Sequence, residues 1–163
     1  MPLAASSEMR RTEFRIQQAV RAMQAGSVIA YPTEAVWGLG CDPNQAAAVQ
    51  DLLQMKVRDW RKGVILIAAS IEQCEPYLTE VTAEQRALMA ASWPGPNTWL
   101  VPNNGAASDW VTGGQATLAL RVSAHPVVQA LCTAFGGPIV STSCNRAGEE
   151  PARTKREVIQ YFH

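Results

Sequence analysis

The sequence is poor in charge and has no excess of either sign. Charged residues make up 17% of the 163 positions, and 14 Lys and Arg balance 14 Asp and Glu. Nonspecific binding to nucleic acid rests on an excess of positive charge, so the balance argues against a bulk attraction of that kind. A local basic patch stays open as an alternative. Apolar residues make up 47%, which is ordinary for a globular protein.

Long apolar runs and leader-like segments are also missing. The apolar stretch at 64–69 suits a buried strand and is far too short to span a bilayer. Residues 1–8 have neither the basic nor the apolar region of a secretory signal. We therefore expect a cytoplasmic protein with no membrane segment.

Clustered metal ligands are absent from the sequence as well. The four cysteines, Cys41, Cys74, Cys132 and Cys144, are widely scattered, and no pair has the spacing C-x-x-C. The two histidines lie far from any clustered ligand pattern. Scattered cysteines of this kind favour reduced thiols in a cytosolic core over disulfides or zinc. We expect the cysteines to carry no metal.

What is present is an alternation of helical and strand patterns. Capping boxes begin at Thr82 and Thr154, and Pro126 suits the first position of a helix. Helices are predicted at 12–25, 44–55, 70–76 and 127–135, and two more begin at 82 and 154. Strands are predicted at 27–31, 64–69, 98–101, 117–122 and 139–141. Loops are expected at 33–43 and 103–114.

This alternation predicts an α/β fold whose sheet is covered, at least in part, on both faces. The length favours one domain over two. We therefore expect residues 1–163 to form a single domain, with roughly the first 12 residues as a flexible arm.

Polar residues follow the first predicted strand. Thr33 and Glu34 would present a hydroxyl and a carboxylate at the strand end, where α/β sheets bind ligands. Gly38 and Gly40 would allow a sharp turn or a close approach to a ligand. An ordinary connection with turn glycines is the alternative.

Cations gather at the end of the second predicted helix. They are Lys56 and Arg58, followed closely by Arg61 and Lys62. The ammonium group of lysine and the planar, bidentate guanidinium of arginine are both suited to binding polyphosphate. The alternative is favourable pairing of cations with a helix C-terminus on a solvated face. The sequence contains no G-x-x-x-x-G-K-[ST] motif, so an ATP site here is not a P-loop.

Two further candidates lie on later strands. If the strand at 139–141 continues, Ser141, Ser143 and Asn145 point the same way and suit phosphate oxygens or an amino acid. A polar turn is the alternative. Arg121 stands in an apolar strand, where an unpaired charge is too costly, so a ligand carboxylate or a structural Asp or Glu must lie beside it. His125 precedes Pro126 and favours a helix cap over a catalytic triad.

Six segments, taken in order, resemble the YrdC/TsaC family from about residue 14 to the end of the chain. They are Ala30-Tyr-Pro-Thr-Glu-Ala-Val-Trp-Gly-Leu-Gly-Cys-Asp42, Lys56-x-Arg58, Lys62-Gly-Val-Ile-Leu-Ile67, Ser92-Trp-Pro-Gly-Pro-Asn-Thr98, Leu118-Ala-Leu-Arg-Val122 and Ser143-x-Asn145. Each motif alone is weak, whereas six in order are specific.

The resemblance implies a twisted, largely open α/β sheet with flanking helices around a concave basic cavity. It implies synthesis of threonylcarbamoyl-AMP and pyrophosphate from L-threonine, bicarbonate and ATP, with Mg²⁺ as the helper of ATP. The product would pass to tRNA threonylcarbamoyl-transferase proteins, and a contact with tRNA is also expected. By matching position, the nucleotide would be bound by Lys56, Arg58, Lys62, Thr117, Ser143 and Asn145, and threonine by Thr33, Arg121 and Ser141. No protein side chain is expected to bind the metal.

Some positions depart from the family pattern. Asp59 stands where proline is common, and Arg146-Ala-Gly148 stands where Leu-Ser-Gly is commoner. Family members usually continue with a strand and a Pro-Ser-containing segment that closes over the nucleotide, and the sequence as far as His163 does not contain them. Two rival functions stay open: a nonenzymatic RNA-binding module, and a hydrolase or transfer domain acting on acyl or carbamoyl phosphates.

Overall fold

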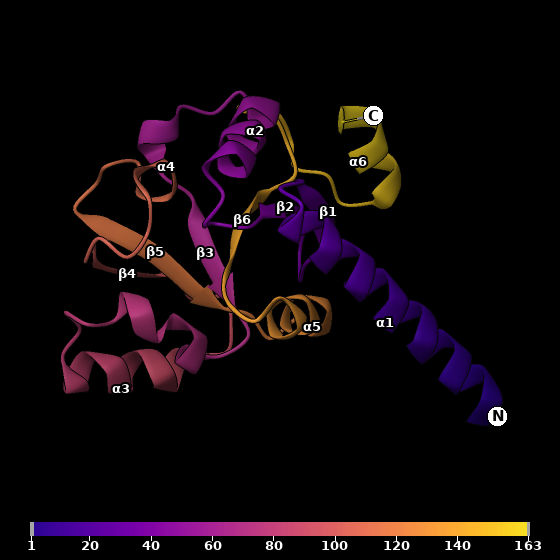
Figure 1. The fold of residues 1–163 in the computed structure, drawn as a ribbon, viewed down its shortest axis with the longest axis horizontal. Helices are drawn as coiled ribbons and strands as arrows, with labels where there is room; N and C mark the ends of the chain where they lie inside the picture. The colour runs from indigo at the N-terminus through magenta and orange to yellow at the C-terminus, as the bar shows by residue number, and fades with distance from the viewer. Residues whose placement is uncertain (1, 163) are drawn as a thin grey trace.

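The computed structural model describes residues 2–162, with side-chain positions from Ser7 onward. Its centre is a mixed, open sheet of six strands in the order β1-β2-β6-β3-β5-β4 (Figure 1). Among the described strands, β3 and β5 pair in parallel and every other pairing is antiparallel. The strands are β1 (Ile29–Pro32), β2 (Trp37–Cys41), β3 (Ile65–Ala68), β4 (Trp99–Pro102), β5 (Thr117–Val122) and β6 (Ile139–Ser143).

Helices surround this sheet, which confirms the predicted α/β class. They are α1 (Pro2–Gln24), α2 (Ala46–Lys56), α3 (Ala83–Ser92), α4 (Asp109–Thr112), α5 (Pro126–Phe135) and α6 (Lys155–Phe162), with short 3-10 segments η1 (Trp60–Lys62) and η2 (Ile71–Tyr77).

One face of the sheet is fully covered. Alternate strand residues such as Leu39, Leu66, Leu120 and Val140 point to this face and are buried. Apolar side chains from α2, η2, α3 and α4 pack against them in the larger core cluster. Burial of this area is the main stabilising contribution to the sheet.

The opposite face is covered at one end only. There α1 and α5 pack against β1, Ile67 and Ile139 in a second core cluster. The rest of this face carries the small and polar residues Ser141, Ala119 and Thr117, together with the apolar Ile65 and Leu100. The prediction of a sheet covered at least partly on both faces is confirmed, and the uncovered end leaves room for a site.

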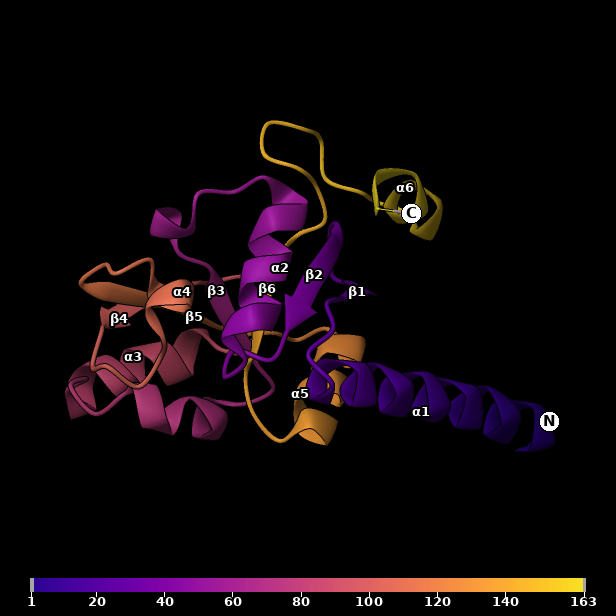
Figure 2. The ribbon, with the colours of Figure 1, turned by 45° about the horizontal axis from the view of Figure 1, so that its top comes forward.

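The first helix begins ten residues earlier than the sequence analysis placed it, at Pro2 instead of Thr12. Residues 7–15 are exposed, so they lack the buried periodic face by which the helix was recognised, and packing begins only at Ile16. Leu, Ala, Glu, Met and Arg in residues 3–11 are good helix formers, which explains the extension. The segment expected to be a flexible arm is thus helical and points away from the sheet (Figure 2); its mobility stays a prediction.

The largest error in the strand prediction is β2, which lies inside the expected loop at 33–43. Its glycines are required by close packing. A Cβ atom on Gly38 would lie 3.0 Å from the ring of Tyr31, and one on Gly40 would lie 2.7 Å from the carbonyl oxygen of Val140. The sequence predicts a sharp turn or a close approach to a ligand at these glycines, whereas in the structure they make room for an aromatic ring from the neighbouring strand.

Most other boundaries agree with the sequence. The capping box at Thr82 is present, and His125 caps α5 by accepting a hydrogen bond from the Val127 N–H. The N-cap of α2 is Gln45 rather than Asn44, the expected loop at 103–114 contains α4, and β6 continues two residues beyond Ser141. All four cysteines are free and buried. Across residues 2–162, no helix combines the length and apolar character that crossing a membrane requires.

Candidate functional site

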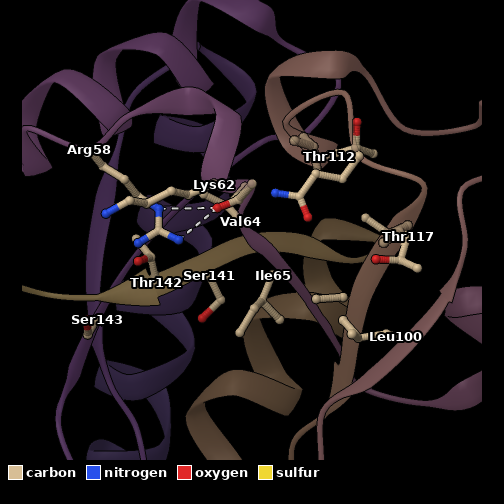
Figure 3. Close-up of a pocket in the computed structure, with 15 residues that line it drawn as sticks. Arg58, Lys62, Val64, Ile65, Leu100, Thr112, Thr117, Ser141, Thr142 and Ser143 are labelled. Atoms are coloured by element: carbon tan, nitrogen blue, oxygen red, sulfur yellow. Dashed lines mark hydrogen bonds between the residues drawn. The ribbon is translucent and has the colours of Figure 1, made fainter.

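A cavity of about 400 Å³ opens at the uncovered end of the sheet (Figure 3). Five of the nine predicted site residues line it: Arg58, Lys62, Thr117, Ser141 and Ser143. The lining includes these two cations and no carboxylate. Sequence reasoning missed Thr112, Gln115 and Thr142, which also line it. The first two belong to or follow α4, an element that the sequence did not reveal.

Strand register explains why distant residues meet at this cavity. Ile65 pairs with Ser141 of β6 on one side and with Ala119 of β5 on the other. Since β6 runs antiparallel to β3, the carboxyl end of β6 meets the amino ends of β3 and β5. The expectation of a ligand site at the end of the first strand concerned Thr33 and Glu34, and neither residue lines this cavity.

The Arg58 guanidinium is held at the mouth of the cavity by the backbone. Its Nε and Nη2 atoms both donate to the Gly63 carbonyl oxygen, at 3.2 and 3.0 Å (Figure 3). The helix α2 is capped by Val57, which has the left-handed φ of 53°, unusual for a β-branched residue. This reversal directs the chain toward the cavity. The Arg58 N–H groups that do not donate to Gly63 can donate to an anion in the cavity.

Lys56 lies behind the cavity wall and does not line it. Its side chain is buried, with Nζ donating to the carbonyl oxygens of Ser143 and Asn145 and to Asn145 Oδ1, the last at 2.7 Å. Ser143 Oγ donates to the same Oδ1 atom at 2.8 Å. Burial, followed by the nearby charge of Arg58, lowers the pKa of Lys56 to about 8. The Lys-x-Arg and Ser-x-Asn pairs are thus joined into one unit.

Tyr31 fixes the orientation of Ser141. The phenol donates to Ser141 Oγ at 2.6 Å, and the ring is buried over Gly38 and Gly40. Burial raises the pKa of Tyr31, against the opposing effects of the Ser141 hydrogen bond and the charge of Arg121. A neutral phenol donor leaves the Ser141 proton free to point toward an acceptor in the cavity. Sequence reasoning had placed Tyr31 only within a strand.

The remaining predicted residues, Thr33 and Arg121, lie outside the cavity lining. Arg121 forms an ion pair with Glu34, Nη2 to Oε2 at 3.0 Å, and its Nε donates to the Gly95 carbonyl oxygen at 3.0 Å. The acidic partner is therefore a structural one, which was one of the two alternatives. The Thr33 hydroxyl donates to the Val36 carbonyl oxygen within its own loop.

Neither a metal centre nor an activated thiol is evident. Across residues 2–162, no group of three or more His, Cys, Asp or Glu is placed to hold a metal ion. Burial raises the pKa of each of the four cysteine thiols, so a thiolate nucleophile is disfavoured at neutral pH. The arrangement is suited to binding and neutralising an anionic ligand rather than to covalent catalysis.

Comparison with known sequences gives a consistent result. The model of the Sua5/YciO/YrdC family, described as telomere recombination, matches residues 21–163. A protein of Cellvibrio japonicus is 57% identical over 148 residues, which is 91% of this chain and 78% of that protein. One from Chromohalobacter salexigens is 56% identical over 154 residues, which is 94% of this chain and 83% of that protein. Both relatives are named threonylcarbamoyl-AMP synthase.

Solved structures show the same fold. P. abyssi Sua5, in a crystal structure described as complexed with L-threonine, superposes with a TM-score of 0.87 at 31% identity. The match covers 93% of this chain and 44% of the Sua5 chain, so this chain spans a little under half of that protein. E. coli YciO superposes with a TM-score of 0.78 at 26% identity, over 91% of this chain and 72% of its own.

Proposed function

The chain belongs to the Sua5/YciO/YrdC family, and on that premise we propose that it is a threonylcarbamoyl-AMP synthase. It would form the adenylate and pyrophosphate from L-threonine, bicarbonate and ATP. The names of relatives at more than half identity support this activity over a nonenzymatic RNA-binding module. The threonine-bound Sua5 structure supports threonine as the amino acid.

One observation carries the proposal: two cations and five hydroxyl side chains line a single cavity. Arg58 and Lys62 stand on one wall, with Thr117, Ser141 and Ser143 around the floor and far wall. Cations neutralise phosphate charge, and hydroxyls donate to phosphate oxygens. We assign nucleotide binding to this group. Lys56 and Asn145 would contribute indirectly, because their hydrogen bonds hold Ser143 in place.

The threonine subsite would lie beside the nucleotide, toward Arg121. The Ser141 hydroxyl, oriented by Tyr31, faces the cavity, and the charge of Arg121 is close enough to affect the Tyr31 phenol. Arg121 would bind the threonine carboxylate. Because the Thr33 proton is engaged with Val36, the Thr33 oxygen can only accept a hydrogen bond from a ligand, such as the threonine N–H.

The chemistry proposed is a displacement at phosphorus. The threonine amine adds to bicarbonate, with loss of water, to give a carbamate. A carbamate oxygen then forms a bond to the α-phosphorus of ATP, the bond from that phosphorus to the β-phosphate oxygen breaks, and pyrophosphate leaves. Positioning and charge neutralisation supply most of the rate enhancement in such a step.

Magnesium would enter with the nucleotide as part of the substrate. The cavity lining has no carboxylate to hold a metal ion, whereas a triphosphate offers hard oxygen ligands. Bound in this way, the ion would neutralise charge on the departing pyrophosphate. The protein contribution at the same phosphates would come from Arg58 and Lys62.

The product would serve tRNA modification. We expect a cytoplasmic protein whose adenylate passes to tRNA threonylcarbamoyl-transferase proteins, and a contact with tRNA is part of this proposal. An anhydride of this kind is prone to hydrolysis, so direct transfer to the next protein would limit its loss.

The test is release of pyrophosphate by the purified protein given ATP, magnesium, threonine and bicarbonate. Release should require all four, and Arg58→Ala should reduce it. Arg86→Ala, on the far side of the sheet in an ion pair with Glu75, serves as the matched control and should retain activity. Pyrophosphate release that is independent of threonine and bicarbonate would overturn the proposed function.

A further inference from the structure

A chain of hydrogen bonds joins the loop after β1 to β5 and to the start of α5. Glu34 Oε2 accepts from Arg121 Nη2 at 3.0 Å, and Glu34 Oε1 accepts from Ser123 Oγ at 2.8 Å. Ser123 Oγ in turn accepts from the His125 N–H at 3.0 Å. Arg121 Nε donates to Gly95 at 3.0 Å, which extends the chain to the segment before β4.

The donor and the acceptor of each hydrogen bond in this series are fixed. Ser123 is fully buried, and its oxygen already accepts the His125 N–H, so its one proton must go to Glu34. Burial alone would raise the pKa of Glu34, but hydrogen bonds from its own backbone and from Ser123, with the charge of Arg121, hold the pKa below its usual value. Glu34 is therefore an ionised acceptor at neutral pH.

The ion pair spans the sheet. Glu34 follows β1, the first strand in sheet order, whereas Arg121 lies on β5, with β2, β6 and β3 between them. The loop at 33–36 must therefore reach over the uncovered face, and the two carboxylate oxygens of Glu34 attach it there by accepting from Arg121 and Ser123. This attachment brings Thr33 toward Arg121, although the two residues belong to distant parts of the sheet.

We propose that Glu34 is a positioning residue of the threonine subsite: it fastens the loop at 33–36 across the sheet and orients the Arg121 guanidinium. With Nε held by Gly95 and Nη2 by Glu34, the Nη1 atom of Arg121 has no hydrogen-bond partner within residues 2–162 and remains for the substrate carboxylate. The identity of the ligand rests on the proposed function, whereas the orienting of Arg121 does not.

A merely structural ion pair would behave differently. The two side chains are 22% and 40% exposed, and pairs of that exposure contribute little to folding stability. Loss of the Glu34 charge should therefore leave the fold and ATP binding intact. It should weaken threonine binding, because a guanidinium that is no longer oriented must be ordered by the substrate itself.

The experiment compares wild type with Glu34→Gln and with a matched control, Glu75→Gln. Glu75 also pairs with an arginine, Arg86, at comparable exposure, but in η2 and α3, which pack on the covered face of the sheet. Calorimetric titration would measure threonine and ATP binding separately in bicarbonate-depleted buffer. In parallel, NMR would follow the Arg121 Nε–H signal, assigned by its absence in Arg121→Lys.

For Glu34→Gln we expect threonine affinity to fall by roughly tenfold, the change that one lost charge-assisted hydrogen bond produces. ATP affinity should stay as in wild type, and the Arg121 Nε–H should exchange faster with water. Glu75→Gln should match wild type in all three measurements. Threonine affinity unchanged in Glu34→Gln, or ATP affinity falling equally with it, would overturn the assignment. If wild type binds no threonine, the proposed function is wrong, and an unchanged NMR signal would then refute the orienting role by itself.

Discussion

Replacement of Gly40 by alanine should destabilise the fold at the centre of the site. The added Cβ would lie 2.7 Å from the Val140 carbonyl oxygen and 2.9 Å from Tyr31 Cε1. One obstacle is the backbone of the neighbouring strand and the other is a buried ring, so neither can move cheaply. Overpacking of this kind costs about 1–3 kcal/mol. For a chain of this size, the melting temperature should fall by roughly 2–12 °C.

Urea denaturation followed by circular dichroism would measure the change, with thermal scans beside it. The midpoint should fall without a change in slope, which identifies a loss of stability rather than a change in the unfolded state. Gly137→Ala is the matched control, because nothing lies within 4 Å of the Cβ it would add. If Gly40→Ala and Gly137→Ala unfold at the same urea concentration, the packing of Tyr31 across this strand is wrong.

Three further predictions concern ligand binding and pH. Arg58→Ala should weaken ATP binding by about tenfold or more, since charge-assisted contacts contribute roughly 1.5–3 kcal/mol, and unchanged affinity in calorimetry would contradict the assignment. Arg121→Ala should weaken threonine and serine binding together, while wild type separates the two by no more than about 10- to 200-fold, because they differ by one methyl group; loss of threonine binding alone would argue against a shared carboxylate contact. The pKa of Lys56 is about 8 in the fold against a usual 10.5, so between these values the unfolded chain binds more protons and stability should rise with pH. Urea titrations of wild type and Lys56→Met at several pH values in this range would measure the free energy of unfolding. If that free energy depends on pH in the same way in both proteins, the prediction is wrong.

Much of the fold was readable from the sequence because local signals agreed with packing. The capping box at Thr82 and Pro126 at the start of α5 each satisfy groups within a few residues, so their effect is local. The strand at 117–122 alternates because one of its faces is buried. The glycine-rich β2 had no such signal, since its conformation depends on a ring from β1.

The sequence predicted which types of residue form the site, but not which contacts they make. An arginine in an apolar strand demanded an anionic partner, and the sequence could not decide between a ligand and Glu34, because their approach depends on the order of the strands. Ser123 gave no signal, since its role depends on the Glu34 loop reaching it. Lys56 was expected to bind the nucleotide, and only the tertiary fold shows that its ammonium holds Ser143 and Asn145.

The most direct test of the account is mass detection of the adenylate itself. The protein would be incubated with ATP, magnesium, threonine and bicarbonate labelled with heavy carbon. A threonylcarbamoyl-AMP synthase should give a threonylcarbamoyl-AMP peak shifted by the mass of one heavy carbon, formed in equal amount with pyrophosphate. Release of pyrophosphate with AMP but no labelled adenylate, even when the products are quenched at once, would contradict it.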